Sequence, residues 1–271
     1  MFCIEYKGAP VFYQISGTPS LFPPLLLLHG FLEDSRMWDG MISSLESKGL
    51  VVRVDLPGHG KSGCFDSTHT MEEMAEAVLA IIKHLEIPKP IILGHSMGGY
   101  VALAYAQNYT QIGGLGLFFS TPYADSAARQ MMRERSEKLV TYHKESFIRT
   151  AIAQLFSESL RPIYADKISQ QIEYSLEISI KGIIAAIRGI KIRSDKTNIL
   201  AQPPQALSPN KIGVFVGQTD TIIPFGKTKE WIALPGIGFN FISSHGHMGH
   251  ISDTLNCTKA VIKWWSRFKK S

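Results

Sequence analysis

The chain has 271 residues, of which 45% are hydrophobic and 19% charged, and its net charge is +5. This composition is typical of a globular protein, and no apolar run approaches the roughly 20 residues needed to span a bilayer. Only KWWSRFKK, near the C-terminus, mixes basic and aromatic residues as nucleic-acid-binding segments do, and it reads as the last turns of an amphipathic helix. We therefore expect a small-molecule substrate, no nucleic-acid partner and no membrane span, with the oligomeric state left open.

The ends and the cysteines bear on the cellular compartment. The N-terminus, MFCIEYKGAP, lacks the basic and then apolar order of a signal peptide. Cys3, Cys64 and Cys257 are few and scattered, which favours a reduced setting over a disulfide framework. We expect a cytoplasmic protein.

Short apolar strands alternate with amphipathic helices along the first part of the chain. Two strands are expected within residues 2–16, and further strands at residues 25–28, 51–56, 91–93 and 112–119. Helices are expected at residues 35–48, 71–85 and 98–108, the second of them with Thr70 as its N-cap. This order predicts an α/β fold with a mostly parallel sheet and helices on both faces.

The alternation stops at Thr121-Pro122 and resumes after the loop Gln202-Pro203-Pro204. Residues 125–191 contain long helical patterns and no convincing strand, so they are interpreted as a helical insertion. Strands are then expected at residues 212–216 and 238–242, with helices at residues 225–234 and 253–269. The predicted organisation is a core of residues 1–121 and 201–271, with an inserted helical segment of residues 122–200.

The segment Gly94-His95-Ser96-Met97-Gly98 matches G-x-S-x-G between a strand and a helix, with Gly99 following. A turn from strand directly into helix strains the backbone of its middle residue, and the flanking glycines remove side chains that would collide there. Such a turn holds a serine at the N-terminus of a helix, where negative charge is favoured. Ser96 is therefore the candidate nucleophile.

A serine nucleophile needs a base and an acid that orients the base, following Ser96 in the order acid, then histidine. Asp220, in VGQTDTIIP, comes just after a predicted buried strand and is the candidate acid. Three other aspartates after Ser96 lie in or beside the insertion and are interpreted as surface charges: Asp125, Asp166 and Asp195.

The stretch SSHGHMGH carries His245, His247 and His250 between the last strand and the last helix. His247, in mid-loop, is the preferred base, and His250 is the alternative. A zinc site built on the H-x-H-x-x-H spacing is the minor hypothesis, because no second cluster with ligand spacing is found. We expect no metal and no cofactor.

The oxyanion that forms on a substrate carbonyl needs two backbone donors. The N–H of Met97, directly after the nucleophile, is one candidate. The other is the N–H of Phe31 in the loop His29-Gly30-Phe31-Leu32, where Gly30 lets the backbone approach closely. A plain tight turn is the alternative for His29 and Gly30.

Five motifs occur together in order: LLLLHGF, DLPGHGKS, GHSMGG, VGQTDTIIP and GHMGH. In this order and spacing the chain resembles the α/β-hydrolase superfamily, most of all its small, capped, single-domain bacterial serine hydrolases of the carboxylesterase type. The resemblance implies an eight-stranded, mostly parallel sheet, with residues of about 122–200 forming a helical cap over the active site. It also implies that residues 55–62 form a structural loop beside the site. The serine at position 96 differs from the aspartate that similar epoxide hydrolases and haloalkane dehalogenases carry there.

Three functions remain open at this level. The first is hydrolysis of a small-molecule carboxylic ester through Ser96, His247 and Asp220. The second uses the same triad to cleave a carbon–carbon bond or eliminate a carboxylate from an anionic substrate, which arginines of the cap would clamp. Those arginines are Arg129, Arg133, Arg135, Arg149, Arg161, Arg188 and Arg193. The third is a ligand-binding module without turnover.

Overall fold

The computed structural model describes residues 1–207 and 209–269. Within them one sheet has eight strands in the order β1-β2-β4-β3-β5-β6-β7-β8. The strands are β1 (Phe2–Tyr6), β2 (Ala9–Ser16), β3 (Leu25–Leu28), β4 (Val51–Val54), β5 (Ile91–His95), β6 (Gly114–Phe118), β7 (Ile212–Gly217) and β8 (Ile237–Ser243). β1 pairs antiparallel with β2, and β2 with β4, whereas all the other neighbours are parallel. The predicted α/β class, with a mostly parallel eight-stranded sheet, is confirmed.

The central strands are apolar throughout because both faces of the sheet are covered. All four leucines of β3 are fully buried. Leu26 and Leu28 join the core on one face, and Leu25 and Leu27 join the core on the other. This division follows from the alternation of side chains along a strand.

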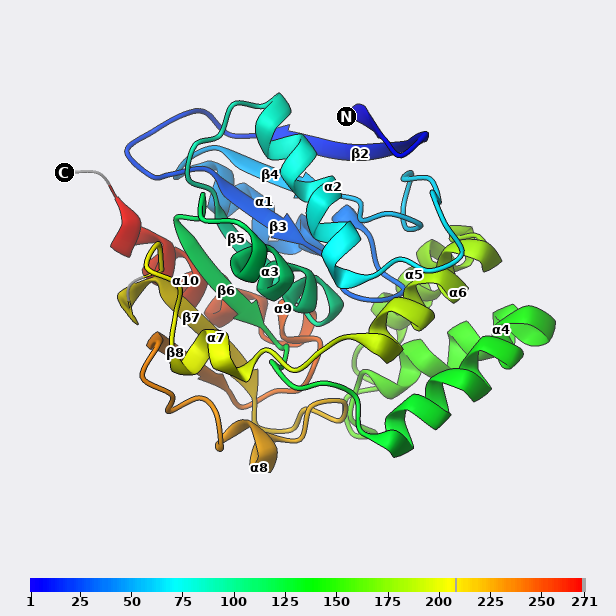
Figure 1. Cartoon of the computed structure of the whole chain (residues 1–271). Coiled ribbons are helices and arrows are strands. Elements are labelled where there is room, and N and C mark those ends of the chain that lie inside the picture. Colours follow the sequence, from blue (N-terminus) through cyan, green and yellow to red (C-terminus); the bar gives the residue numbers. More distant parts are fainter. Residues whose placement is uncertain (208, 270–271) are drawn as a thin grey trace.

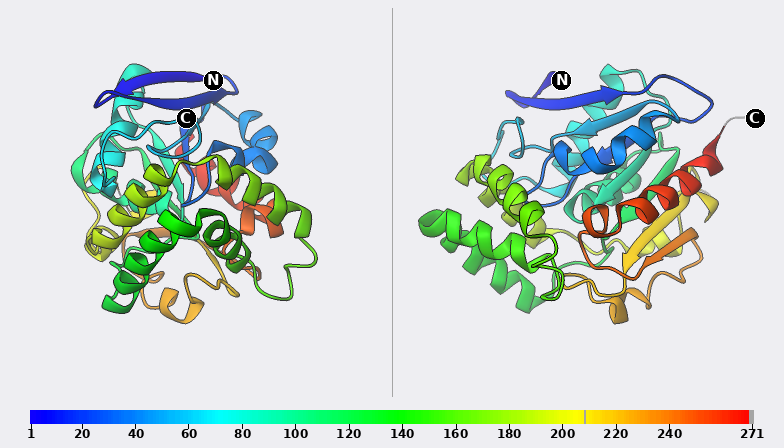
Figure 2. Two further views of the ribbon diagram at one scale, coloured as in Figure 1. Left: turned by 90° about the vertical axis from the view of Figure 1, so that its right-hand side faces the viewer. Right: turned by 180° about the vertical axis from the view of Figure 1, so that it is seen from behind.

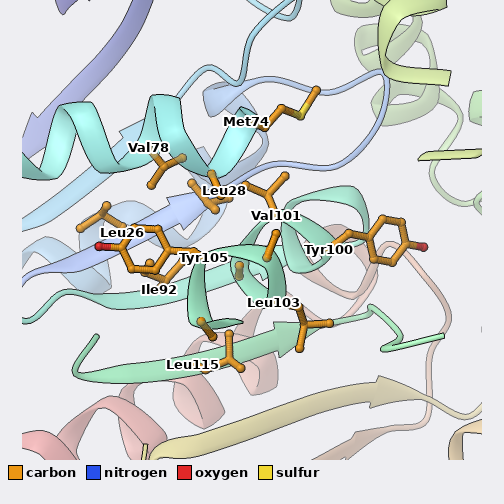
Figure 3. Close-up of a cluster of buried hydrophobic side chains, with 14 of the residues drawn as sticks. Leu26, Leu28, Met74, Val78, Ile92, Tyr100, Val101, Leu103, Tyr105 and Leu115 are labelled. Carbon is orange, nitrogen blue, oxygen red and sulfur yellow. The ribbon is translucent and has the colours of Figure 1, made fainter. Parts of the chain in front are cut away.

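Helices cover both faces, as Figures 1 and 2 show. α2 (Met71–His84) and α3 (Met97–Asn108) lie on one face, and α1 (Asp39–Glu46) and α10 (Thr254–Trp265) lie on the other. Thr70 caps α2 through a reciprocal pair of contacts with Glu73, as the sequence predicts for that position. α3 is buried on every side from Met97 to Ala106, and Figure 3 shows Val101 near Leu28 of β3 and Leu103 near Leu115 of β6.

Residues 122–200 hold the helices α4 (Ala127–Gln154), α5 (Ala165–Glu177) and α6 (Ile180–Ile192) and most of α7 (Thr197–Ala201). α4 is bent at His143, whose backbone angles are not helical. Figure 1 shows α4, α5 and α6 beyond the arrowheads of the central strands, at the carboxyl edge of the sheet. The two chain segments that lead into and out of this layer are joined by a hydrogen bond from Lys196 N–H to Pro122 O.

The cap, as we call residues 122–200, has its own apolar cluster of Val140, Ile148, Ile152, Phe156, Ile168, Ile172, Ile178, Ile183 and Ile187. Two core residues complete the cluster: Leu32, from the loop after β3, and Met248, from the loop after β8. The cap therefore packs directly onto both loops.

Several elements differ from the sequence prediction. The first helix opens with a 3-10 turn at Ser35–Trp38. α8 ends at Thr228 instead of residue 234, and the chain continues through turns to Pro235. A short helix, α9 (Gly249–Ser252), precedes α10, which ends at Trp265 before a 3-10 turn at Ser266–Phe268. Within residues 1–207 and 209–269, no helix is both long and apolar enough to cross a membrane.

Candidate active site

Ser96 sits between the end of β5 and the start of α3 with φ 47° and ψ −112°, a strained conformation for a residue with a side chain. Its N–H donates to Phe118 O at 3.0 Å, and its carbonyl accepts from the Ser120 hydroxyl at 2.7 Å. A Cβ on Gly94 would collide with the carbonyl of Gly98, and one on Gly98 would lie 2.6 Å from His29 O. Both glycines are therefore required by the close approach of backbone around Ser96.

Asp220 and His247 meet across two loops at the carboxyl edge of the sheet. Asp220 follows β7 and His247 follows β8, which are neighbouring strands. His247 Nδ1 lies 2.9 Å from Asp220 Oδ2, and both side chains are 2% exposed. The second oxygen, Oδ1, accepts the N–H groups of Ile222 and Ile223 at 2.8 Å each. The carboxylate is thus fixed by its own loop, and it holds the imidazole with Nδ1 protonated and Nε2 free to accept a proton.

The loop that carries His247 (the histidine loop) lies against the turn that carries Ser96 (the serine turn). The ring of His95, the residue before Ser96, contacts the carbonyl oxygen of His247 through Nε2 at 3.1 Å. Among the hydrogen bonds of the described residues, none engages the Ser96 hydroxyl, so that group is free for a substrate. Contacts of a catalytic base often shorten only when a substrate is bound.

The three histidines of SSHGHMGH have three different surroundings. His245 is half-buried, and His247 contacts Asp220. His250 is buried with Glu33 and His95, and its Nε2 lies 3.7 Å from Glu33 Oε1. The H-x-H-x-x-H spacing therefore does not gather its members around one point, and the acid chosen from the sequence lies beside His247 and not beside His250.

Glu33, His95 and His250 are the one group among the described residues whose ligand atoms lie close enough together to hold a metal ion. His95 Nδ1 and Glu33 Oε2 are already paired at 2.7 Å, however. A metal bound through His95 Nδ1 would have to displace that contact. The sequence patterns missed this group because its members come from three separate segments: Glu33 from the loop after β3, His95 from the end of β5 and His250 from α9.

The loop after β3 is held in a defined orientation by His29, which is fully buried. His29 Nε2 accepts the N–H of Leu56 at 2.8 Å, so the ring proton is on Nδ1, which donates to Gly30 O at 2.8 Å. In a trans peptide the N–H points opposite to the carbonyl, so the Phe31 N–H is turned away from His29. Neither the Phe31 N–H nor the Met97 N–H is engaged in a hydrogen bond within the described chain. Both remain available to an oxyanion, with Met97 at the first position of α3.

Two cap residues that the sequence did not indicate bind the same loop. Gln171 and Ser175, one turn apart on α5, both donate to the carbonyl oxygen of Leu32, at 3.0 and 2.7 Å. Leu32 has φ 63°, so this loop is strained and needs external support. The buried polar pair on an otherwise apolar helix face is the only local signal that could have revealed them.

The interpretation of Asp125 as a surface charge is wrong. Its side chain is fully buried and lies 2.9 Å from Arg193 and 3.2 Å from Arg133. Burial opposes ionisation, but the two guanidinium groups outweigh it and lower the pKa of Asp125. Asp166 and Asp195 are exposed, as expected.

Most of the cap arginines pair with carboxylates or main-chain carbonyls of the protein itself. Arg188 pairs with Glu137, Arg149 with Glu145, and Arg161 donates to main-chain carbonyls. Arg129 and Arg193 line a cavity of about 120 Å³ beside the Asp220 loop. Arg129 donates there to Ile222 O, and Arg193 is committed to Asp125.

Comparison with known proteins agrees with this architecture. A family model described as the alpha/beta hydrolase fold matches residues 23–162. A thermophilic esterase from Thermogutta terrifontis superposes with a TM-score of 0.86 at 29% identity, over 97% of this chain and 95% of that one. The enol-lactonase of Burkholderia xenovorans LB400 superposes with a TM-score of 0.85 over 97% and 99%, at 19% identity, which speaks for the fold alone.

Among curated sequences, the chain is 29% identical over 225 residues to the dihydrolipoyllysine-residue acetyltransferase component of an acetoin cleaving system from Pseudomonas putida. The match covers 79% of this chain but only 58% of that relative. With a family model that matches more than half of its length, and a fold shared along nearly all of it, the chain belongs to the α/β-hydrolase fold family.

Proposed function

We propose that this protein is a serine hydrolase that cleaves a small-molecule carboxylic ester through an acyl-enzyme intermediate. The observation that carries the proposal is the buried contact between His247 and Asp220 beside the strained turn that presents Ser96. Family membership and the resemblance to an esterase along nearly the whole chain support hydrolysis in general. The ester as substrate is supported by the arrangement of Ser96, His247 and Asp220.

In the proposed reaction the Ser96 Oγ attacks the ester carbonyl while His247 Nε2 takes its proton. Asp220 stabilises the imidazolium that forms. The carbonyl oxygen gains negative charge and accepts the N–H groups of Phe31 and Met97. His247 then returns the proton to the departing alcohol. Water, deprotonated by His247, releases the acyl group as a carboxylic acid and regenerates Ser96.

The alternative of a carbon–carbon hydrolase or carboxylate-eliminating lyase requires free cations at the site. Arg129 and Arg193 are the cap arginines nearest the Asp220 loop, and both are engaged by protein groups. An ester needs no such cation, so the arrangement favours the ester reading. The ligand-binding alternative gives no reason for free N–H groups at both Phe31 and Met97.

A fluorophosphonate probe tests the proposal, because it labels only an activated serine. We expect wild-type protein to label and to hydrolyse p-nitrophenyl esters, and both Ser96→Ala and His247→Ala to lose both properties. Ser44→Ala and His84→Ala, at exposed positions, are the matched controls and keep them. Labelling that survives His247→Ala but not His250→Ala would identify His250 as the base. A wild type that binds esters without labelling or turnover would favour the binding module.

A further inference from the structure

Glu33 is a buried carboxylate in the loop that carries Phe31. Its side chain is 1% exposed, and its Oε2 accepts the N–H of Gly30 at 2.8 Å and contacts His95 Nδ1 at 2.7 Å. A buried ionised carboxylate is costly unless a charge and hydrogen bonds compensate it. Glu33 therefore calls for a cation, and His95 is the group beside it.

The surroundings of His95 define its charge. One ring nitrogen faces the Glu33 carboxylate, and the other faces the carbonyl oxygen of His247. The carbonyl oxygen can only accept, so the nitrogen that faces it carries a hydrogen, and an ionised Glu33 requires a second hydrogen on the other nitrogen, which makes the ring an imidazolium. Burial disfavours this charge, but the attraction and hydrogen bond of Glu33 raise the pKa of His95. Burial likewise opposes ionisation of Glu33, and the charge of His95 overcomes it and lowers the pKa of Glu33 to about 2.

We propose that Glu33 and His95 are positioning residues. Their buried ion pair fixes the loop of Phe31, the turn of Ser96 and the loop of His247 relative to one another. Glu33 binds the main chain of the oxyanion loop at Gly30. His95 belongs to the serine turn, and its second N–H binds the main chain of the histidine loop at His247. The inference rests on the proposed function for its catalytic meaning, whereas the ion pair itself is a property of the protein.

The packing around the pair leaves little room for another arrangement. A Cβ at Gly30 would lie 2.7 Å from His95 Nδ1 and would collide with Glu33 Oε2. The centroids of the His247 and His250 rings lie 5.0 and 5.2 Å from the centroid of the His95 ring. Burial lowers the pKa of His250 to about 3, with Glu33 opposing the shift and His95 and His247 adding to it, so His250 stays neutral. Of the two histidines that face Glu33, His95 is therefore the one that carries the positive charge.

The first test is spectroscopic and does not depend on turnover. In protein labelled with ¹⁵N-histidine, we expect the His95 ring to keep two bound protons at neutral pH, above the ordinary imidazole pKa, because Glu33 raises the pKa of His95. The signal is assigned by its loss in His95→Gln. A His95 ring with one proton at neutral pH would overturn the proposal. So would a stoichiometric metal ion found by elemental analysis of the purified protein, because a metal on His95 Nδ1 excludes the proton there.

The second test is kinetic. Glu33→Gln keeps the shape but removes the charge, so His95 loses one proton and cannot satisfy both neighbours. We expect kcat to fall roughly 10-fold to 100-fold while KM changes little, because neither residue touches the substrate. In the double variant Glu33→Gln/His95→Gln the loss should be no greater than in the worse single variant, since both act through one contact. Glu5→Gln, at an exposed position, is the matched control and stays at the wild-type rate.

The outcomes separate this inference from the proposed function. If wild type fails to label with fluorophosphonate, the ester hydrolase proposal fails, and the two-proton signal of His95 still decides whether the pair exists. If wild type labels but Glu33→Gln retains full kcat, the pair does not position the loops. The same conclusion follows if the fold-losses of kcat in the two single variants multiply in the double variant. Should Glu33→Gln fail to fold, the spectrum of wild type remains the deciding measurement.

Discussion

The Ser175 hydroxyl donates to the carbonyl oxygen of Leu32 at 2.7 Å, a contact that joins the cap to the oxyanion loop. The same hydroxyl lies 2.7 Å from Gln171 O, one turn earlier in α5. Since Leu32 follows Phe31, the position of the proposed oxyanion donor depends partly on a helix of the cap. This main-chain carbonyl therefore connects the cap to the proposed oxyanion donor, in addition to the packing of Leu32 and Met248.

Replacing Ser175 with alanine tests that connection. We expect kcat on an ester to fall roughly threefold to tenfold, because the strained loop loses one of the two hydrogen bonds that α5 donates to Leu32 O. The free energy of unfolding should fall by about 1–2 kcal/mol, the usual cost of a buried hydrogen bond. Ser136→Ala is the control, because its hydroxyl also bonds the carbonyl four residues earlier but on the exposed face of α4. Equal kinetic effects in the two variants would contradict the role given to Leu32.

The acid of the triad is tested by Asp220→Asn. The amide keeps the size of the side chain but no longer enforces the tautomer in which His247 Nε2 is the base. We expect kcat to fall by roughly 10³-fold to 10⁴-fold, with KM and thermal unfolding nearly unchanged. Asp166→Asn, at an exposed position of α5, serves as control. Activity within about tenfold of wild type would assign the orienting acid elsewhere.

The buried pair of Asp125 and Arg193 is expected to matter for stability more than for chemistry. Asp125→Asn leaves the guanidinium of Arg193 without a counter-charge, although it still stacks on Tyr100 at 4.1 Å. We expect the free energy of unfolding in urea to fall by about 3–5 kcal/mol. The double variant Asp125→Leu/Arg193→Met should recover much of that loss, because it removes the buried carboxylate and the Arg193 guanidinium together and leaves only the partly exposed Arg133 without its partner. A double variant that is less stable than the single one would contradict this account.

Buried neutral histidines make the fold sensitive to mild acid. Burial, with nearby His29, lowers the pKa of His59 from its ordinary 6.5 to about 3. Between these values the unfolded chain binds a proton that the folded chain does not, so stability falls as the pH decreases through this window. The slope is at most about 1.4 kcal/mol per pH unit for each such histidine. His250 contributes in the same window, and Glu33 adds to the loss only below its ordinary pKa of 4.5.

His95 acts in the opposite direction and outside that window. Its raised pKa contributes stability below the ordinary value of 6.5, and this contribution is lost as the pH rises through the folded-state pKa. Urea unfolding at several pH values should therefore show a positive slope of stability with pH between about pH 4.5 and pH 6.5. His59→Asn, which keeps a donor for Pro57 O, should reduce this slope by the share of one histidine. An unchanged slope would show that His59 is already protonated in the folded state.

The sequence predicted features that depend on neighbours along the chain. The strained turn at Ser96 needs glycines two positions away on either side, and these are visible in five consecutive residues. Asp220 stands three residues beyond the end of a fully apolar strand, which places it at the carboxyl edge. The contact between His247 and Asp220 then follows from the neighbouring positions of β7 and β8.

Features that depend on contacts between distant segments could not be predicted in this way. Glu33, His95 and His250 meet only because a loop, the end of β5 and α9 converge, and no sequence spacing links them. In the sequence, Asp125 resembles any acidic residue before a helix. Its contacts with Arg133 and Arg193 exist only in the folded chain. The end of α8 was missed for a different reason. Residues 229–234 form turns closed by local hydrogen bonds, such as Trp231 N–H to Thr228 O, and the side-chain spacing of such turns is close to that of a short helix.

The apolar cluster of the cap contains Leu32 and Met248, which directly follow Phe31 and His247, the proposed oxyanion donor and base. An exchange of this cap for that of a related hydrolase would thus replace the packing partners of both loops, together with Gln171 and Ser175. Unless a new cap supplied equivalent neighbours for Leu32 and Met248, we expect the chimera to carry out the proposed reaction more slowly. Cap residues that face away from Leu32 and Met248 can therefore vary with less effect on the loops of Phe31 and His247 than residues of the apolar cluster.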